Sequence, residues 1–186
     1  MVFVDGSNLL IELGSTLSVK VRSDQPGTDA LSMATQCVTQ SLADVFSSPI
    51  GPHKVTRKYW FGAIQGSQEH LQRMERELRD FGYEAVLFSK RKNGREKGVD
   101  LAVAREMLIH GFNRNYRTAI LVAGDEDYLG LVQDLKRLGL VVVGLFFDGP
   151  ALSPRLRVAL DLFIRMRHPY DVNRVLAQQL QSASGE

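Results

Sequence analysis

The chain has 186 residues, of which 44% are hydrophobic and 24% are charged, and its formal net charge is +2. These values indicate a globular domain with a real core, and the absence of any run of about 18 apolar residues excludes a membrane span. The single cysteine, Cys37, cannot form an internal disulfide. We therefore expect a buried structural thiol and a reducing compartment, by default the cytoplasm. A strand predicted at the first residues leaves no room for a signal peptide.

Charge is unevenly distributed along the sequence. Residues 53–98 carry 11 basic and 6 acidic groups, whereas residues 1–52 carry 2 and 5. Residues 99–150 carry 5 basic and 7 acidic groups, and residues 151–186 carry 5 basic and 3 acidic groups. Two interpretations stay open: an acidic centre with basic flanks, as a nuclease needs, or a solvated surface that is basic in its middle.

The first half of the chain alternates between apolar runs and amphipathic stretches. Residues 14–27 and 47–52 are rich in Gly, Ser, Asp or Pro and predict loops, and residues 90–98 form a basic loop. In chain order, the predicted elements are a strand at 1–4, a helix at 28–46, a strand at 55–64, a helix at 68–81 and a strand at 83–88.

The second half continues the alternation. Gly111 and Gly139 are predicted to close the helices that precede them. The predicted elements are helices at 99–109, 127–138, 152–160 and 170–180, and strands at 118–123, 140–147 and 162–166. Strands that alternate with helices predict an α/β fold with a mostly parallel sheet and helices on both faces. We expect one domain over residues 1–168, followed by a terminal helix and frayed tail over residues 169–186.

Four aspartates lie after apolar runs or at helix starts in separate parts of the sequence. In an open α/β sheet, functional groups gather outside the carboxyl ends of the strands, so we expect these acids to meet there. Crowded carboxylates repel one another unless a cation neutralises them, and oxygen ligands without His or Cys select a hard ion such as Mg²⁺ or Mn²⁺. The sequence therefore predicts a metal site for phosphate-ester chemistry. Its acids are Asp5, Asp100, Asp125 and Asp127.

Structural explanations exist for single members of this set. Asp5 is equally suited to capping the next helix, and Asp100 lies where a helix dipole stabilises a carboxylate. Three acids at residues 125–127 exceed what capping requires, although Glu126 is not expected to be a ligand. Asp161 is a weaker candidate, with a structural acid bonded to a backbone N–H as its alternative.

Other catalytic patterns fit poorly. The four histidines have no metal-ligand spacing, and the chain has no Walker motif, no G-x-G-x-x-G and no serine in a nucleophile elbow. A phosphohydrolase of the haloacid-dehalogenase kind needs a second aspartate where Ser7 stands. A small-ligand-binding Rossmann-like domain needs the glycine fingerprint after the first strand.

Several phrases, taken in order over roughly residues 1–166, resemble the NYN domain family, which is part of the PIN-like ribonuclease superfamily. They are residues 4–8 (VDGSN), 97–100 (KGVD), 124–128 (GDEDY), 138–144 (LGLVVVG) and 152–163. The sequence departs from the family pattern at three places. Ala123 stands where Ser is frequent, Glu126 where a small polar residue is usual, and Tyr128 where Phe is more usual.

The resemblance implies a three-layer PIN-like or Rossmann-like fold. It also implies metal-dependent cleavage of RNA that leaves a 5′-phosphate and a 3′-hydroxyl. By the same resemblance, Asp5, Asp100 and Asp125 would be ligands of Mg²⁺ or Mn²⁺. Asp127 would join them directly or through water, and Asn8 would support Asp5 or contact the scissile phosphate.

The basic loop is the predicted RNA contact, because it precedes Asp100 and should flank the metal rim. Basic side chains neutralise phosphates and release counterions, so binding should depend on salt. A solvated loop without RNA contact is the alternative. The predicted contacts are Lys90, Arg91, Lys92, Arg95 and Lys97. A second basic edge could comprise Arg155, Arg157, Arg165 and Arg167, and Trp60 could stack on a base or lie in the core.

The alternative function is a catalytically silent RNA-binding or adaptor module on the same fold. The set of acids argues against it, because a binder of anions gains nothing from them. We expect single-stranded or structured RNA as the partner and no membrane. A homodimer or a protein partner, the identity of the RNA, and endonucleolytic or exonucleolytic cutting all stay open.

Overall fold

The computed structural model of the chain describes residues 1–16, 28–48, 54–90 and 98–167. They contain a six-stranded sheet with the order β3-β2-β1-β4-β5-β6, in which every pairing is parallel. The predicted α/β fold is therefore confirmed. The strands are β1 (Val2–Asp5), β2 (Lys58–Ile64), β3 (Glu84–Ser89), β4 (Thr118–Val122), β5 (Val141–Phe146) and β6 (Leu162–Arg165).

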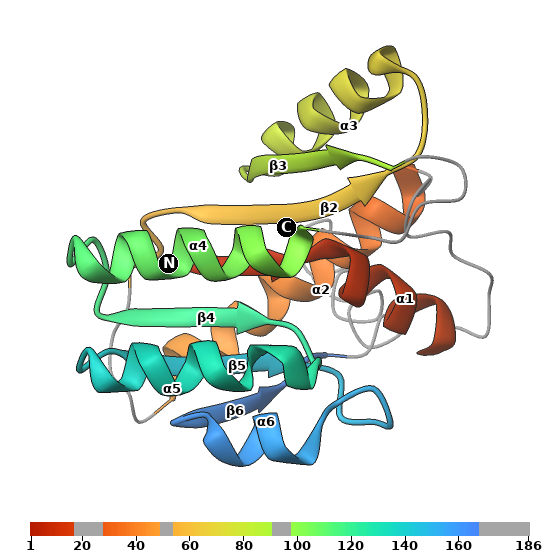
Figure 1. Cartoon of the computed structure of the whole chain (residues 1–186). Coiled ribbons are helices and arrows are strands. Elements are labelled where there is room, and N and C mark those ends of the chain that lie inside the picture. The colour runs from red at the N-terminus through yellow and green to blue at the C-terminus, as the bar shows by residue number, and fades with distance from the viewer. Residues whose placement is uncertain (17–27, 49–53, 91–97, 168–186) are drawn as a thin grey trace, which may run out of the picture.

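Helices cover both faces of this sheet (Figure 1). On one face, buried side chains of α1, α2 and α3 join one hydrophobic cluster, and on the other face those of α4, α5 and α6 join a second. A short 3₁₀ turn, η1, precedes α5. The helical elements are α1 (Gly6–Thr16), α2 (Thr28–Phe46), α3 (Gln68–Asp80), α4 (Val99–Phe112), η1 (Glu126–Tyr128), α5 (Leu129–Arg137) and α6 (Pro154–Ala159).

The strand order places a crevice at the carboxyl edge of the sheet. All four residues of β1 are buried, as expected of a central parallel strand covered on both faces. The chain leaves β1 toward β2 and β3 on one side, and β4, β5 and β6 follow on the other. The connection after β1 and the connection after β4 therefore run to opposite sides of the sheet. Open α/β sheets bind their ligands in the crevice between two such strands. In Figure 1, the arrowheads of β2, β3 and β4 point toward this edge.

Gly6 allows α1 to begin directly after β1. A Cβ atom at this position would collide with the Trp60 indole and would lie 2.8 Å from the carbonyl oxygen of Phe61. Because β2 passes so close, only a residue without a side chain fits between the end of β1 and the first turn of α1. Gly6 therefore sets where Asp5 stands at the edge of the sheet.

Most predicted elements are present, and the largest differences, of three residues each, are at three boundaries. Residues 14–16 belong to α1, not to a loop, and β2 begins at Lys58, three residues later than expected. Gly111 does not close α4, which continues to Phe112. Its role is close packing, because a Cβ there would lie 2.8 Å from Leu140 Cδ1. The rest of that predicted loop, residues 17–27, and the predicted helix at 170–180 lie outside the described residues.

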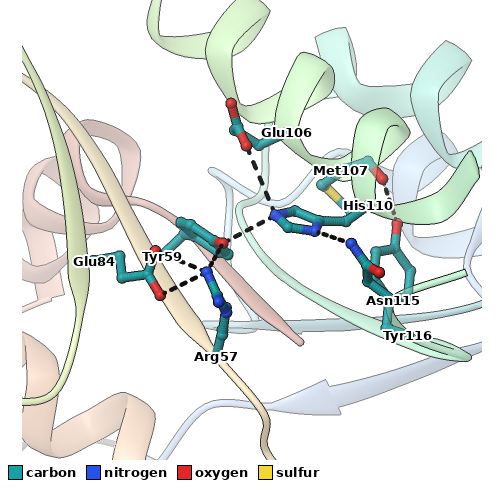
Figure 2. Close-up of polar contacts among 8 residues, drawn as sticks. All are labelled: Arg57, Tyr59, Glu84, Glu106, Met107, His110, Asn115 and Tyr116. Atoms are coloured by element: carbon teal, nitrogen blue, oxygen red, sulfur yellow. Dashed lines mark hydrogen bonds and ion pairs between the residues drawn. The ribbon is translucent and has the colours of Figure 1, made fainter. Parts of the chain in front are cut away.

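A polar cluster fastens the opposite, amino edge of the sheet (Figure 2). His110, in the last turn of α4, lies 2.9 Å from the Tyr59 hydroxyl and 2.8 Å from the Asn115 amide. Tyr59 lies at the start of β2, so these bonds join the end of α4 to that strand. His110 therefore has a structural environment, on the edge away from the crevice.

Two further predictions concern the chain as a whole. Cys37 is fully buried as a free thiol, and burial raises the pKa of this thiol to about 12, which fits the expected structural role. None of the helices in the described ranges has both the length and the apolar character needed to cross a bilayer.

We expect Gly6→Ala to lower the free energy of unfolding by at least about 1–3 kcal/mol, because the new methyl group must displace the Trp60 ring or the β2 backbone. Gly130→Ala in α5 is the matched control, since nothing lies within 4 Å of its Cβ position. Because alanine is the better helix former, this control should gain about 0.5–1 kcal/mol. Urea denaturation measures both changes. Equal midpoints for the two variants would contradict the close approach at Gly6.

Candidate functional site

Three of the predicted acids line one pocket at the carboxyl edge. The pocket has a volume of about 140 Å³ and lies where the ends of β1 and β4 meet the first turn of α4. Asp5, Asp100 and Asp125 contribute to its wall, although they are far apart in the sequence. The remaining lining residues are Ser7, Asn8, Ile11 and Val99.

Asp5 serves as a helix cap and as a wall of the pocket. It is the last residue of β1 and is only 3% exposed. Its Oδ1 accepts a hydrogen bond of 3.0 Å from the Asn8 N–H, as the side chain of an N-cap residue does for the third residue of a helix. The structural and functional interpretations of Asp5 are therefore compatible, because the carboxylate that caps α1 also lines the pocket.

Asp100 reaches the pocket from the first turn of α4. It is exposed, and the helix dipole favours a negative charge there. The preceding Gly98 has φ of 105°, a left-handed conformation that residues with a side chain rarely adopt. This glycine turns the chain into α4 beside β1, so that Asp100 comes to face Asp5 across the pocket.

Asp125 is held in place by its own turn and by α1. Its Oδ1 accepts a hydrogen bond of 3.1 Å from the Asp127 N–H and so caps η1. The preceding Gly124 donates its N–H to Asn8 Oδ1 at 3.0 Å. Asn8 therefore binds the end of β4 to the first turn of α1, and this contact brings Asp125 to the same edge as Asp5.

Tyr128 is the residue that sequence reasoning missed. Its hydroxyl donates to Asp5 Oδ2 at 2.7 Å and lies 3.2 Å from Asp100 Oδ1. Burial raises the pKa of Tyr128 far above its usual range, and the charges of Asp5 and Asp100 raise it further. The phenol therefore stays protonated and acts as a hydrogen-bond donor. The only signal in the sequence was the replacement of the more usual Phe.

Other predicted acids are not brought into the pocket. Asp127 is exposed and is not among the lining residues. Glu126 accepts hydrogen bonds from Ser153 Oγ at 2.9 Å and Arg155 Nη1 at 2.6 Å, so its charge is paired with a cation. Asp161 accepts from a backbone N–H, that of Val142, and pairs with Lys136 at 3.0 Å, which matches its structural alternative.

The predicted RNA contacts are described only in part. Lys90 follows β3, is half-buried, and its backbone N–H donates to Ile64 O at 2.9 Å. Trp60 is 1% exposed and belongs to the core, so it cannot stack on a base in this conformation. Arg91, Lys92, Arg95 and Lys97 lie outside the described residues.

The second basic edge is largely occupied by ion pairs. Arg155 pairs with Glu126 at 2.6 Å, Arg157 with Asp148 at 2.8 Å, and Arg167 with Asp44 at 2.6 Å. Pairing with carboxylates leaves these guanidinium groups less able to attract phosphates than isolated cations would be. The second basic edge therefore has a structural explanation.

The pocket has the donor chemistry of a hard-cation site. Its three carboxylates offer oxygen atoms alone, which is the ligand set that suits Mg²⁺ and Mn²⁺. Within the described ranges, however, no three carboxylate, imidazole or thiol groups are arranged so that they could hold a metal ion. The residues thus have the ligand chemistry that a divalent ion needs, but their side chains are not arranged around one point.

The volume of the pocket is smaller than that of a typical cofactor site. Its volume of about 140 Å³ is below the roughly 300–1,000 Å³ of typical small-molecule pockets. A cavity of about 200 Å³ lies at the amino edge, but its described lining includes no carboxylate, imidazole or thiol. The carboxyl-edge pocket is therefore a better candidate for chemistry than this cavity, and it suits an ion and phosphate oxygens better than a whole nucleotide.

Comparisons with known proteins agree with the fold. The model of the NYN domain matches residues 1–167. A crystal structure of a protein of unknown function from Vibrio parahaemolyticus is similar over 90% of this chain and 92% of its own, with a TM-score of 0.61 and 18% sequence identity. At that identity the likeness concerns the fold alone. No curated protein matches the chain.

We expect Asn8→Ala to lower the free energy of unfolding by about 1–3 kcal/mol, because the buried Gly124 N–H loses its acceptor. Asn115→Ala is the control, since it removes an exposed amide contact with His110 and should change stability by no more than about 0.5 kcal/mol. Chemical denaturation without divalent ions measures both. A wild-type midpoint for Asn8→Ala would show that this bond does not hold the end of β4.

Proposed function

Since the chain belongs to the NYN domain family, we propose that it is a metal-dependent ribonuclease that hydrolyses RNA phosphodiester bonds at the carboxyl-edge pocket. NYN domains are nuclease-like domains, and NYN and PIN-like nucleases usually use divalent metals. The observation that carries the proposal is the meeting of Asp5, Asp100 and Asp125 in one pocket.

Asp5, Asp100 and Asp125 would hold Mg²⁺ or Mn²⁺, and the exposed Asp127 would join them directly or through water. Such an ion, when bound, supplies positive charge that stabilises phosphate oxygens and makes water a better nucleophile. The products would carry a 5′-phosphate and a 3′-hydroxyl, as the family resemblance implies.

The chain's own groups would orient the reacting parts. Asn8 fixes the end of β4 relative to α1 and borders the pocket, where it can also contact the scissile phosphate. Glu126, whose added charge could have repelled the substrate, is paired with Arg155 at 2.6 Å. That ion pair limits the cost of an acid near a polyanion and ties η1 to α6.

RNA would be held by the basic loop, of which Lys90 is the described member. Its predicted partners in this role are Arg91, Lys92, Arg95 and Lys97. Because the loop directly precedes α4 in the sequence, we expect it to flank Asp100 and to bring positive charge near the carboxylates. A homodimer, a protein partner and the cytoplasmic compartment stay predictions.

The alternative is an RNA-binding or adaptor module without catalysis. Such a module would bind RNA in a salt-sensitive way but would not need divalent ions. Salt-sensitive binding without cleavage under Mg²⁺ or Mn²⁺ would favour it over the ribonuclease.

We expect cleavage of labelled single-stranded RNA with Mg²⁺ or Mn²⁺, none with EDTA, and a loss of at least roughly a hundredfold in Asp125→Asn. A residue that only supports a ligand already costs up to that much. The control is Asp134→Asn on α5, which removes an exposed acid paired with Arg137. Full cleavage by Asp125→Asn, or equal losses in both variants, would rule out the assignment.

Reversing the charges of Lys90, Arg91 and Lys92 to Glu should weaken RNA binding at low salt. The slope of log K against log salt should fall by about 0.7 for each phosphate of single-stranded RNA that the variant no longer neutralises. Binding is measured in the Asp125→Asn background, which avoids cleavage during the titration.

The matched control for this charge reversal changes three basic residues at the amino edge of the sheet to Glu. They are Arg114, Arg117 and Arg137. Both triple variants alter the net charge equally, so a difference between them reports position. Equal effects on RNA affinity would favour the alternative, in which the basic loop is a solvated surface without RNA contact.

A further inference from the structure

One phenolic oxygen lies against two of the three pocket carboxylates. The Tyr128 hydroxyl contacts Asp5 Oδ2 at 2.7 Å and Asp100 Oδ1 at 3.2 Å. These residues belong to η1, to the end of β1 and to the first turn of α4. Tyr128 lies 123 residues from Asp5 and 28 from Asp100. A single oxygen atom therefore connects three elements that are well separated along the chain.

The hydroxyl has only one proton to give. It can point fully at one carboxylate at a time, so the two acids share a single donor. The shorter distance shows that Asp5 receives the stronger bond, with Asp100 as the longer, second contact. A phenol is protonated at neutral pH, so this hydroxyl acts as a donor to the carboxylates that it contacts. The residue is thus neither a base nor a nucleophile.

The tyrosine approaches from the core. Its side chain is 1% exposed, packs in the hydrophobic cluster beneath α4 and α5, and is not among the residues that line the pocket. Asp5 Oδ1 already accepts from the Asn8 N–H, so both oxygens of this carboxylate have a donor within the protein. The orientation of Asp5 is thereby set before anything enters the pocket.

We propose that Tyr128 is a positioning residue that fixes the carboxylates of Asp5 and Asp100 relative to each other for binding a divalent ion. This inference rests on the proposed function, since it takes these carboxylates as the ion's ligands. Partners that orient ligand side chains strengthen metal binding roughly ten- to a hundredfold. A phenylalanine at this position keeps the ring in the core but offers no donor, so Asp5 Oδ2 and Asp100 Oδ1 would lose the hydroxyl that they share.

The test is calorimetric titration of Mn²⁺ into metal-free protein, without RNA. Tyr128→Phe should bind Mn²⁺ roughly ten- to a hundredfold more weakly than wild type. Tyr116→Phe is the matched control, because it removes another buried tyrosine hydroxyl, one that donates to Met107 O at 2.6 Å at the amino edge. This control should leave the affinity unchanged. Wild-type affinity in Tyr128→Phe would overturn the positioning role.

A spectroscopic measurement on the wild-type protein keeps the inference testable if Tyr128→Phe folds poorly. A bound cation is the largest local charge in its site, so an ion beside Asp5 and Asp100 changes the field at the phenol. Mg²⁺ should therefore perturb the near-ultraviolet absorption of tyrosine. Tyr116→Phe should show the same difference spectrum. No perturbation at saturating Mg²⁺ would overturn the inference.

The outcomes separate this inference from the ribonuclease proposal. Weaker Mn²⁺ binding by Tyr128→Phe, together with no RNA cleavage by wild type, would support the positioning role and reject the ribonuclease. Wild-type Mn²⁺ affinity in Tyr128→Phe, together with cleavage that is abolished in Asp125→Asn, would do the reverse. No Mn²⁺ binding by wild type would overturn both.

Discussion

Two carboxylates of like charge, those of Asp5 and Asp100, lie on either side of one buried hydroxyl, and much of the architecture serves that contact. β1 must end at Asp5 and turn at once into α1, which requires Gly6. α4 must begin beside β1, which the left-handed Gly98 permits. η1, which follows β4, must place the Tyr128 hydroxyl beside both carboxylates. Because these carboxylates repel each other, a donor between them stabilises an arrangement that bare charges would oppose.

The acids outside the pocket show how the chain separates structural from functional charge. Glu126 pairs with Arg155, Asp161 with Lys136, and Asp148 with Arg157. Each pair joins residues that are not sequence neighbours, and in each pair a lysine or arginine lies beside the carboxylate. The acids of the pocket also accept hydrogen bonds from neutral donors, a backbone N–H for Asp5 and Asp125 and a phenol for Asp5 and Asp100. Neutral donors orient a carboxylate without cancelling its charge.

The sequence could predict the sheet and two of its acids because both depend on local pattern. An apolar run followed at once by an acid places Asp5 and Asp125 at strand ends, and parallel strands bring such ends to one edge. Asp127 shares the local pattern of Asp125, yet the tight turn of η1 presents the two differently, and its N–H is what Asp125 caps. Gly111 looked like a helix stop, but only the distant Leu140 reveals that it permits close packing.

The Tyr128 contact could not be predicted, because its partners are fixed by the fold and not by neighbouring residues. The same contact bears on the choice between an enzyme and a passive RNA binder. A binder gains from cations and loses from acids, because phosphate is repelled by carboxylates at close range. Burying Asp5 to 3% exposure costs free energy, and the hydrogen bonds to both of its oxygens offset part of that cost. A divalent ion held by these carboxylates would instead supply positive charge that attracts phosphate. The donors that orient the Asp5 carboxylate therefore favour a proposed function in which an ion is bound there.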